Sequence, residues 1–110
     1  MMTGNELAVA AQQGLRVTCV VFNNSMYGTI RLHQERTYPG RVSGTDLASP
    51  DFVKYVEAFG GMGVRVDNNA DIADGVRKVL GHPGIGLLEI AVSQDAIAVG
   101  QSLQQLRAAH

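Results

Sequence analysis

The sequence has no tryptophan, only three prolines and a single cysteine, Cys19, among its 110 residues. A single cysteine excludes an internal disulfide and suits a reducing compartment, so we expect a cytoplasmic protein. Cys19 lies within an apolar run, which favours a small buried thiol over a reactive nucleophile. The apolar runs are far shorter than the roughly 18 residues of a membrane span. The start of the chain, Met1-Met2 followed by polar TGNE, does not resemble a secretory signal.

The chain also lacks an excess of either charge. Its 9 basic and 10 acidic residues give a formal net charge of −1, which provides no electrostatic footprint for nucleic acid or for an anionic membrane. We therefore expect neither nucleic acid nor a membrane among its partners. Glycine, in contrast, is abundant: the 13 glycines exceed the roughly 7% average of proteins and indicate sharp turns and close backbone approaches.

Hydrophobic periodicity and turn residues predict helices that alternate with strands. The expected elements are a helix over 3–14, a strand over 17–22, a polar loop over 25–49 with a short helix near 29–35, a helix over 49–59, a strand over 64–66, a helix from 69 or 71 to 80, a strand over 86–92 and a terminal helix over 96–109. This alternation predicts an α/β fold, a parallel sheet with helices on both faces.

Capping residues set the expected ends of two helices. Thr3 and Glu6 form a T-x-x-E capping box at the start of the first helix, and Gly14 supplies its C-terminal stop. Ser49 as N-cap and Pro50 at the first helical position open the helix over 49–59.

The strand over 17–22 has almost no polar alternation, which indicates a strand covered on both faces of a parallel sheet. The order of elements begins on a helix without the strand that should precede it. We therefore expect the chain to be part of a longer protein.

Two side-chain amides, Asn23 and Asn24, come directly after this strand. In open α/β sheets ligands bind beyond the carboxyl ends of the strands, and an amide oxygen is a hard, uncharged ligand of the kind that Mg²⁺ accepts. The turn over 25–29 adds hydroxyls and N–H groups suited to a phosphate, and the helix starting at Thr3 offers its positive N-terminus to the same anion. The alternative is that the pair only forms a turn.

A second amide pair, Asn68-Asn69, is an internal control. It follows the short strand over 64–66 and runs straight into a helix, so a turn and an N-cap explain it. No comparable loop containing Gly and Tyr follows it. The two pairs are therefore predicted to differ because their surroundings differ.

Three segments resemble one family: MTGNELAVAAQQGL (2–15), VTCVVFNNSMYGTIRLHQERTYPGR (17–41) and GTDLASPDFVKYVEAFGG (44–61). They are similar to the C-terminal, diphosphate-binding domain of thiamine diphosphate-dependent enzymes, in the group of acetolactate synthase, benzoylformate decarboxylase and pyruvate decarboxylase. The resemblance extends to about Val92. It implies that residues 1–110 form a single, partial C-terminal thiamine diphosphate-binding domain whose fold lacks its first strand.

The resemblance also implies a site for thiamine diphosphate and Mg²⁺. The family's signature is Gly-Asp-Gly, a spacer and then Asn-Asn; only the second half is present, and the Asp would fall before Met1. By position, Asn24 resembles the side-chain Mg²⁺ ligand and Met26 the residue that gives its backbone carbonyl. The implied cofactor contacts are Tyr27, Gly28 and Thr29 along the diphosphate, Ile30 near the reacting end, and Thr3 and Gly4 at the start of the helix.

In this family a glutamate on a different domain helps to deprotonate the cofactor, and the active site forms between two subunits. The resemblance thus implies a homo-oligomer, a dimer or tetramer, that works with the remaining domains of the same enzyme on a 2-keto acid. We expect the cofactor-binding part of an acetolactate synthase-like enzyme, inactive as an isolated chain and with its catalytic residues unassigned. The alternatives are a 2-keto acid decarboxylase of the same family and a non-catalytic α/β module for association or regulation.

The segment IRLHQERTYPGR carries further charged groups. Arg31, His33, Glu35, Arg36 and Arg41 could orient a keto-acid carboxylate or move protons, because arginine binds carboxylates through two hydrogen bonds and histidine titrates near neutrality. The alternative is a solvated or interface loop.

A zinc site and a catalytic role for Glu89 are not expected. His33, His82, His110 and Cys19 show no zinc-ligand spacing. Glu89, within GLLEIAV, is expected to form an ion pair at the end of its strand.

Overall fold

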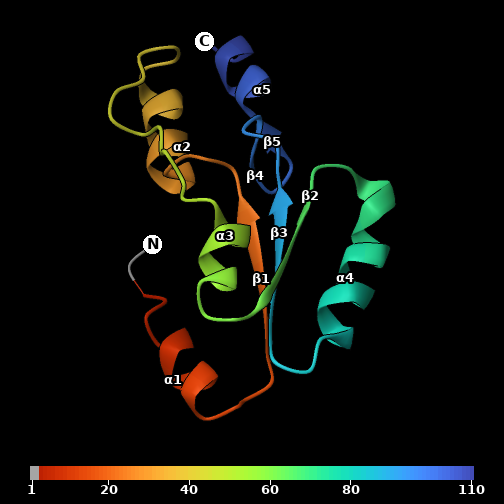
Figure 1. Cartoon of the computed structure of the whole chain (residues 1–110). Helices are drawn as coiled ribbons and strands as arrows, with labels where there is room; N and C mark the ends of the chain where they lie inside the picture. The colour runs from red at the N-terminus through yellow and green to blue at the C-terminus, as the bar shows by residue number, and fades with distance from the viewer. Residues whose placement is uncertain (1–2) are drawn as a thin grey trace. The chain divides into compact units, whose positions relative to one another are not determined.

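The computed structural model describes residues 3–110, which form two compact units. Unit 1 contains the chain up to Asn23 and the segment Pro50–Ala91, and unit 2 contains Asn24–Ser49 and Val92–His110. Figure 1 shows the elements of both units along the chain. Among the described residues, no helix is long and apolar enough to cross a membrane.

Unit 1 is built on a parallel sheet of three strands, β1 (Val17–Asn23), β3 (Ile85–Ala91) and β2 (Met62–Val66), in the order β1-β3-β2. The register places Val17 opposite Ile85 and Met62 opposite Gly86. All three strands run in the same direction, so their carboxyl ends lie at one edge of the sheet. The predicted parallel α/β sheet is confirmed.

Helices cover both faces of this sheet (Figure 1). On one face, α1 (Leu7–Gln12) and α3 (Phe52–Glu57) pack on the strands, and on the other α4 (Ile72–Gly81) packs on β2 and β3. The first core cluster contains Ala10, Phe52, Val56, Ile85 and Leu87, and the second contains Val66, Val79 and Leu88. Successive residues of β3 therefore contribute to opposite cores, as the pleat of a strand requires.

Glycine lets the helices approach the sheet closely at two positions. A Cβ on Gly63 of β2 would lie 2.7 Å from the Cα of Val53 in α3, and a Cβ on Gly86 of β3 would lie 2.7 Å from the carbonyl oxygen of Val79 in α4. Both distances are too short for any side chain. These two glycines therefore set the contact between each helix layer and the sheet.

The prediction that β1 is covered on both faces is wrong for this structure. Its residues alternate between half-buried and exposed, with Val20 50% and Phe22 70% exposed. The physical reason is position: β1 is an edge strand, and α4 packs on β2 and β3. The side chains of β1 that face α1 and α3 are half-buried, while the opposite face is open.

Two predicted helix starts are also wrong. Helix α1 begins at Leu7 rather than near Thr3, because the Glu6 carboxylate accepts a hydrogen bond from the Gly4 N–H (3.0 Å) and no side chain caps the helix. Helix α3 is capped by Asp51, which accepts a hydrogen bond from the Lys54 N–H at 3.0 Å. An ionised carboxylate is a strong N-cap, so the cap lies two residues later than Ser49.

The predicted role of Asn68 is confirmed. Its side-chain oxygen accepts a hydrogen bond from the Asp71 N–H at 3.1 Å and caps a short 3₁₀ turn, Asn69–Asp71, that leads into α4. Gly14 and Gly60, with φ of 64° and 79°, lie just after α1 and α3 as expected for helix ends.

Unit 2 contains α2 (Gly28–Thr37), a small antiparallel pair formed by β4 (Ala96–Ala98) and β5 (Gln101–Ser102), and α5 (Leu103–Ala108). Helix α2 confirms the short helix predicted near 29–35. The predicted helix over 96–109 is wrong in its first half, because Gly100 adopts a φ of 70° that turns the chain into a hairpin. Ser102 and Gln105 then form a capping box, and only the second half is helical.

Candidate functional site

Asn24 forms a turn at the start of the loop that follows β1. Its side-chain oxygen accepts a hydrogen bond from the Met26 N–H at 3.2 Å, the pattern of an Asx turn. Between them Ser25 has a φ of 56°, a left-handed conformation that is uncommon for a residue with a side chain. The turn holds the Asn24 carboxamide in place while leaving it half-buried.

A short antiparallel bridge anchors this loop within unit 2. Met26 pairs with Asp46, and the flanking hydrogen bonds run from the Tyr27 N–H to the Thr45 oxygen and from the Leu47 N–H to the Ser25 oxygen, both 2.8 Å. The Met26 side chain points into the unit and is only 4% exposed. Any contact of Met26 with a ligand is therefore made by its backbone.

Helix α2 starts directly after the loop. No side chain caps its first turn, so its N–H groups are open to an anion. A Cβ on Gly28 would lie 3.1 Å from the Asn24 side-chain nitrogen, so glycine leaves the helix start close to the amide. Tyr27, Thr29 and Ile30 are exposed around this end.

The predicted residues fall into two groups. Those from Asn24 to Ile30 lie together in one continuous segment of unit 2, whereas Thr3 and Gly4 belong to unit 1. There Thr3 and Gly4 line a cavity of about 440 Å³ whose other walls are mainly apolar, among them Leu7, Ala10, Cys19, Phe52 and Leu87. Cys19 packs against the apolar core as predicted, but it is half-buried.

Asn23 has a different environment from its neighbour. It is the last residue of β1, and its side-chain nitrogen donates to Glu89 of β3 at 2.8 Å. Glu89 is 2% exposed and also lies 3.6 Å from the Arg65 guanidinium of β2. The predicted ion pair of Glu89 at the end of its strand is confirmed, and Asn23 completes it.

Glu35 of α2 is fully buried (0% exposed) and receives several hydrogen bonds. Arg107 donates from Nε (3.0 Å) and Nη2 (2.6 Å), the Gly40 N–H donates at 2.9 Å, and Arg31 Nε donates at 3.3 Å. Mainly because of the Arg107 hydrogen bonds, and despite burial, the pKa of Glu35 is lowered to about 2. Glu35 is thus a charged structural anchor rather than a proton carrier near neutral pH.

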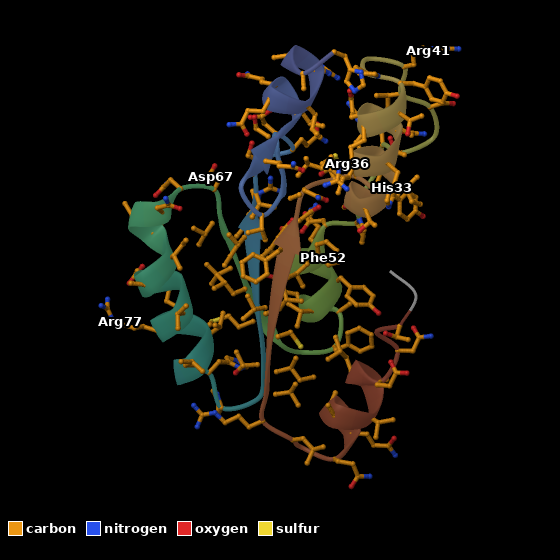
Figure 2. All side chains as sticks on the ribbon, turned by 180° about the vertical axis from the view of Figure 1, so that it is seen from behind. His33, Arg36, Arg41, Phe52, Asp67 and Arg77 are labelled. Atoms are coloured by element: carbon orange, nitrogen blue, oxygen red, sulfur yellow. The ribbon has the colours of Figure 1, made fainter. Side chains whose placement is uncertain are left out.

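The arginines of α2 and of the loop after it contact different partners. Arg31 lies between Glu35 and Asp46, Arg36 donates to the Gln101 side chain at 2.8 Å, and the Arg41 guanidinium lies 5.5 Å from the centre of the Tyr38 ring. Figure 2 shows His33 and Arg36 on α2 and Arg41 in the loop that follows it. His33, Arg36 and Arg41 are exposed.

Sequence reasoning missed Arg107 and Asp46. Arg107 lies 72 residues after Glu35, and no local pattern predicts such a pairing. The S-x-x-Q capping box at Ser102 was a usable signal for α5, which carries Arg107. Over residues 3–110, no group of three or more His, Cys, Asp or Glu side chains could hold a metal ion.

The structure thus has a parallel α/β sheet in unit 1 and, in unit 2, an Asx turn followed by a helix N-terminus. A family model described as thiamine pyrophosphate enzyme, C-terminal TPP binding domain, matches residues 1–90. The chain belongs to this family, which supports thiamine diphosphate as its cofactor.

Full-length relatives are much longer than this chain. It is 35% identical over 121 positions to acetolactate synthase of Mycobacterium bovis, covering 98% of this chain and 19% of that protein. It is 34% identical to the mitochondrial acetolactate synthase of Schizosaccharomyces pombe, with 84% and 14% covered, and 30% identical to the acetolactate synthase large subunit of Cyanidium caldarium, with 96% and 19% covered. The chain thus spans at most about one fifth of these relatives.

Proposed function

We propose that this chain is the cofactor-binding part of a thiamine diphosphate- and Mg²⁺-dependent enzyme that acts on 2-keto acids by decarboxylation and carboligation, as in acetolactate synthase. The observation that carries the proposal is the segment Asn24–Ile30. It combines an Asx turn with an open helix N-terminus in a chain that belongs to the thiamine pyrophosphate enzyme family.

The donor set fits the metal. Asn24 offers a carboxamide oxygen with a second lone pair besides the one used by the Met26 N–H, and Met26 offers a backbone carbonyl. Both are hard oxygen ligands of the kind that Mg²⁺ prefers. Both are neutral, so the cofactor's diphosphate and a carboxylate from elsewhere in the enzyme would supply the charge that balances the metal.

The start of α2 fits the diphosphate. Its free N–H groups and the positive end of the helix dipole favour an anion there. Gly28 keeps the space beside Asn24 open, the exposed Tyr27 and Thr29 flank it, and Ile30 lies one position further along α2, where it would face the reacting end of the cofactor. When bound, the cofactor supplies the stabilisation of a carbanion, and these residues bind and orient it.

We further propose that residues 1–110 serve as one partial domain, with Thr3 and Gly4 as additional cofactor contacts. The rest of the active site would come from other domains of the enzyme and from a second subunit of a homo-oligomer. The relatives, which are about five times longer, support this division.

Nuclear magnetic resonance on the ¹⁵N-labelled chain tests the proposal, because it detects weak binding residue by residue. Adding millimolar thiamine diphosphate with Mg²⁺ is expected to shift the Asn24 carboxamide and the amides of Gly28–Ile30, and each component alone is expected to do much less. Asn24→Ala should abolish the joint effect. Asn68→Ala, at the amide pair that only caps a helix, is the matched control. Equal responses in the two variants would overturn the assignment.

A second candidate is a non-catalytic module for subunit association. The exposed apolar face of β1, with Val20 and Phe22, favours it. It predicts an association that depends on protein concentration, measured by light scattering, together with no response of Asn24 to the cofactor and metal. The titration therefore separates the two candidates.

A further inference from the structure

A series of side-chain contacts connects the loop Asn24–Tyr27 to α5. At the centre of this series is Glu35 of α2. Its buried carboxylate accepts hydrogen bonds from the Gly40 N–H, in the loop after α2, and from Arg107 of α5. Arg107 contacts both carboxylate oxygens, at 3.0 and 2.6 Å. A pair of this geometry fixes orientation as well as distance.

From Glu35 the contacts continue to the loop. Arg31 bonds to Glu35 through Nε at 3.3 Å and reaches Asp46 through Nη1 at 3.4 Å. Asp46 is the residue that pairs with Met26. The guanidinium of Arg31, only 13% exposed, therefore connects the buried carboxylate to Asp46, which pairs with the loop.

A second side chain of α2, that of Gln34, contacts the same segment, residues 43–46. Gln34 donates to the Ser43 backbone oxygen at 2.8 Å and accepts from the Thr45 hydroxyl at 3.3 Å. Thr45 in turn accepts the Tyr27 N–H through its backbone oxygen. Helix α2 therefore contacts Thr45 through the Gln34 side chain, and Thr45 contacts Tyr27 through its backbone. A shift of α2 would thus change the position of Tyr27.

The segment Val92–His110, here called the tail, also contacts the loop Asn24–Tyr27 directly. Gln94 donates from its side chain to the Asn24 backbone oxygen at 3.1 Å. The match to the family model ends at residue 90. Gln94 and Arg107 therefore lie beyond the segment that the family model matches.

We propose that the tail positions the loop Asn24–Tyr27, with Glu35 and Arg107 as its positioning residues. The positioning itself concerns only unit 2. Its consequence for cofactor affinity rests on the function proposed above. Without the Arg107 contacts, α2 and the segment at Asp46 lose their common anchor, and the Asn24 turn and the start of α2 no longer keep one fixed geometry.

Amide hydrogen exchange tests the positioning without any ligand. In Glu35→Gln and Arg107→Gln, the N–H groups of Tyr27 and Leu47, which bond across the bridge, are expected to exchange about tenfold faster. Arg77→Gln is the control, because Arg77 is exposed on α4 in unit 1 (Figure 2). Unchanged exchange at Tyr27 and Leu47 in both test variants would overturn the proposal.

Two comparisons separate positioning from a general loss of stability. Arg107→Lys keeps the charge but not the paired hydrogen bonds, so it should restore the exchange rates only in part. The Leu103 N–H, which bonds to the Asp95 oxygen within the tail, reports on the tail itself. An equal acceleration at Leu103 and at Tyr27 in Glu35→Gln would indicate unfolding of the whole unit and would contradict the proposal.

The cofactor provides the last readout. At a temperature where all variants are folded, the dissociation constant for thiamine diphosphate with Mg²⁺ is expected to rise about tenfold in Glu35→Gln and Arg107→Gln, and to stay unchanged in Arg77→Gln. If the parent chain shows no binding while the exchange rates change as expected, the proposed function fails and the positioning stands. If the parent binds and neither affinity nor exchange changes in the variants, the positioning fails alone.

Discussion

Arg107 of α5 forms two hydrogen bonds with the carboxylate of Glu35, 72 residues earlier in the chain. This pair accounts for a carboxylate that has no exposed surface and yet remains charged. The pair also joins α2 to α5, whose buried residues are Glu35 and Leu103, respectively. Unit 2 therefore has a buried carboxylate paired with arginine between two of its helices, whereas the core clusters of unit 1 are apolar.

The first prediction concerns pH. The pKa of Glu35 is about 2 in the folded chain, below its ordinary value of 4.5. A lowered pKa means that its contribution to stability is fully present above about pH 4.5 and is lost as the pH falls towards 2. We expect urea unfolding at pH 7 to show Glu35→Gln less stable by about 1–3 kcal/mol. The two proteins should converge near pH 2, and a difference that stays constant with pH would contradict the assignment.

The second prediction compares two helical glycines. Gly28→Ala would place a methyl 3.1 Å from the Asn24 side-chain nitrogen, whereas a Cβ at Gly81 meets nothing within 4 Å. Gly81→Ala is expected to raise the free energy of unfolding by roughly 0.5 kcal/mol, because alanine has the higher helix propensity. Gly28→Ala should not share this gain and should shift the resonances of the Asn24 carboxamide. Chemical denaturation and NMR measure both, and an undisturbed Asn24 would show that the space at Gly28 is not restricted.

The third prediction concerns Asn68. Asn68→Ala removes the hydrogen bond to the Asp71 N–H and should lower the free energy of unfolding by about 1 kcal/mol, the usual cost of an N-cap. Thermal unfolding followed by circular dichroism measures the change. Asn68→Ser keeps a side-chain acceptor for the Asp71 N–H and should restore part of the stability, without placing a third carboxylate between Asp67 and Asp71. Failure of this rescue would mean that the loss does not come from capping.

The fourth prediction concerns Asn23. Asn23→Ala removes a hydrogen bond to the buried Glu89 and leaves that carboxylate with Arg65 at 3.6 Å. We expect a loss of about 1–3 kcal/mol in urea unfolding, the cost of a poorly satisfied buried charge. The joint response of the chain to thiamine diphosphate and Mg²⁺ should survive in Asn23→Ala and disappear in Asn24→Ala. Loss of the response in both variants would contradict the different roles given to these two amides.

The sequence predicted the parts of the fold that depend on local patterns. The strands around Val20, Val64 and Leu88 and the helices between them follow from apolar runs and periodicity, and the cap at Asn68 follows from its place before a helix. The errors lie where several local signals compete. Thr3 and Ser49 are good capping residues, but the acidic residues after them, Glu6 and Asp51, occupy the N-cap positions.

The candidate site was only partly accessible to sequence reasoning. The position of Asn24 after β1 and the helix that starts at Gly28 were predicted from local features. The bridge between Met26 and Asp46 and the pairing of Glu35 with Arg107 join distant residues of mixed polarity, and neither periodicity nor capping rules report such contacts. The roles of the site residues stay predictions until the cofactor and metal titrations are done.

Unit 2 is formed by two segments that are far apart in the chain, Asn24–Ser49 and Val92–His110, and this separation affects the order in which the unit can fold during synthesis. Asn24–Ser49 emerges before β2 and β3 of unit 1, and the tail that completes its unit emerges after both strands. Until then the carboxylate of Glu35 remains in water without Arg107, and the loop at Asn24 has only part of its support. Since chains fold as they emerge from their N-terminal side, we expect this loop to acquire its final geometry only after the tail has emerged. If the tail positions the loop as proposed, a chain interrupted before Arg107 would contain every residue proposed to contact the cofactor and would not hold them in place.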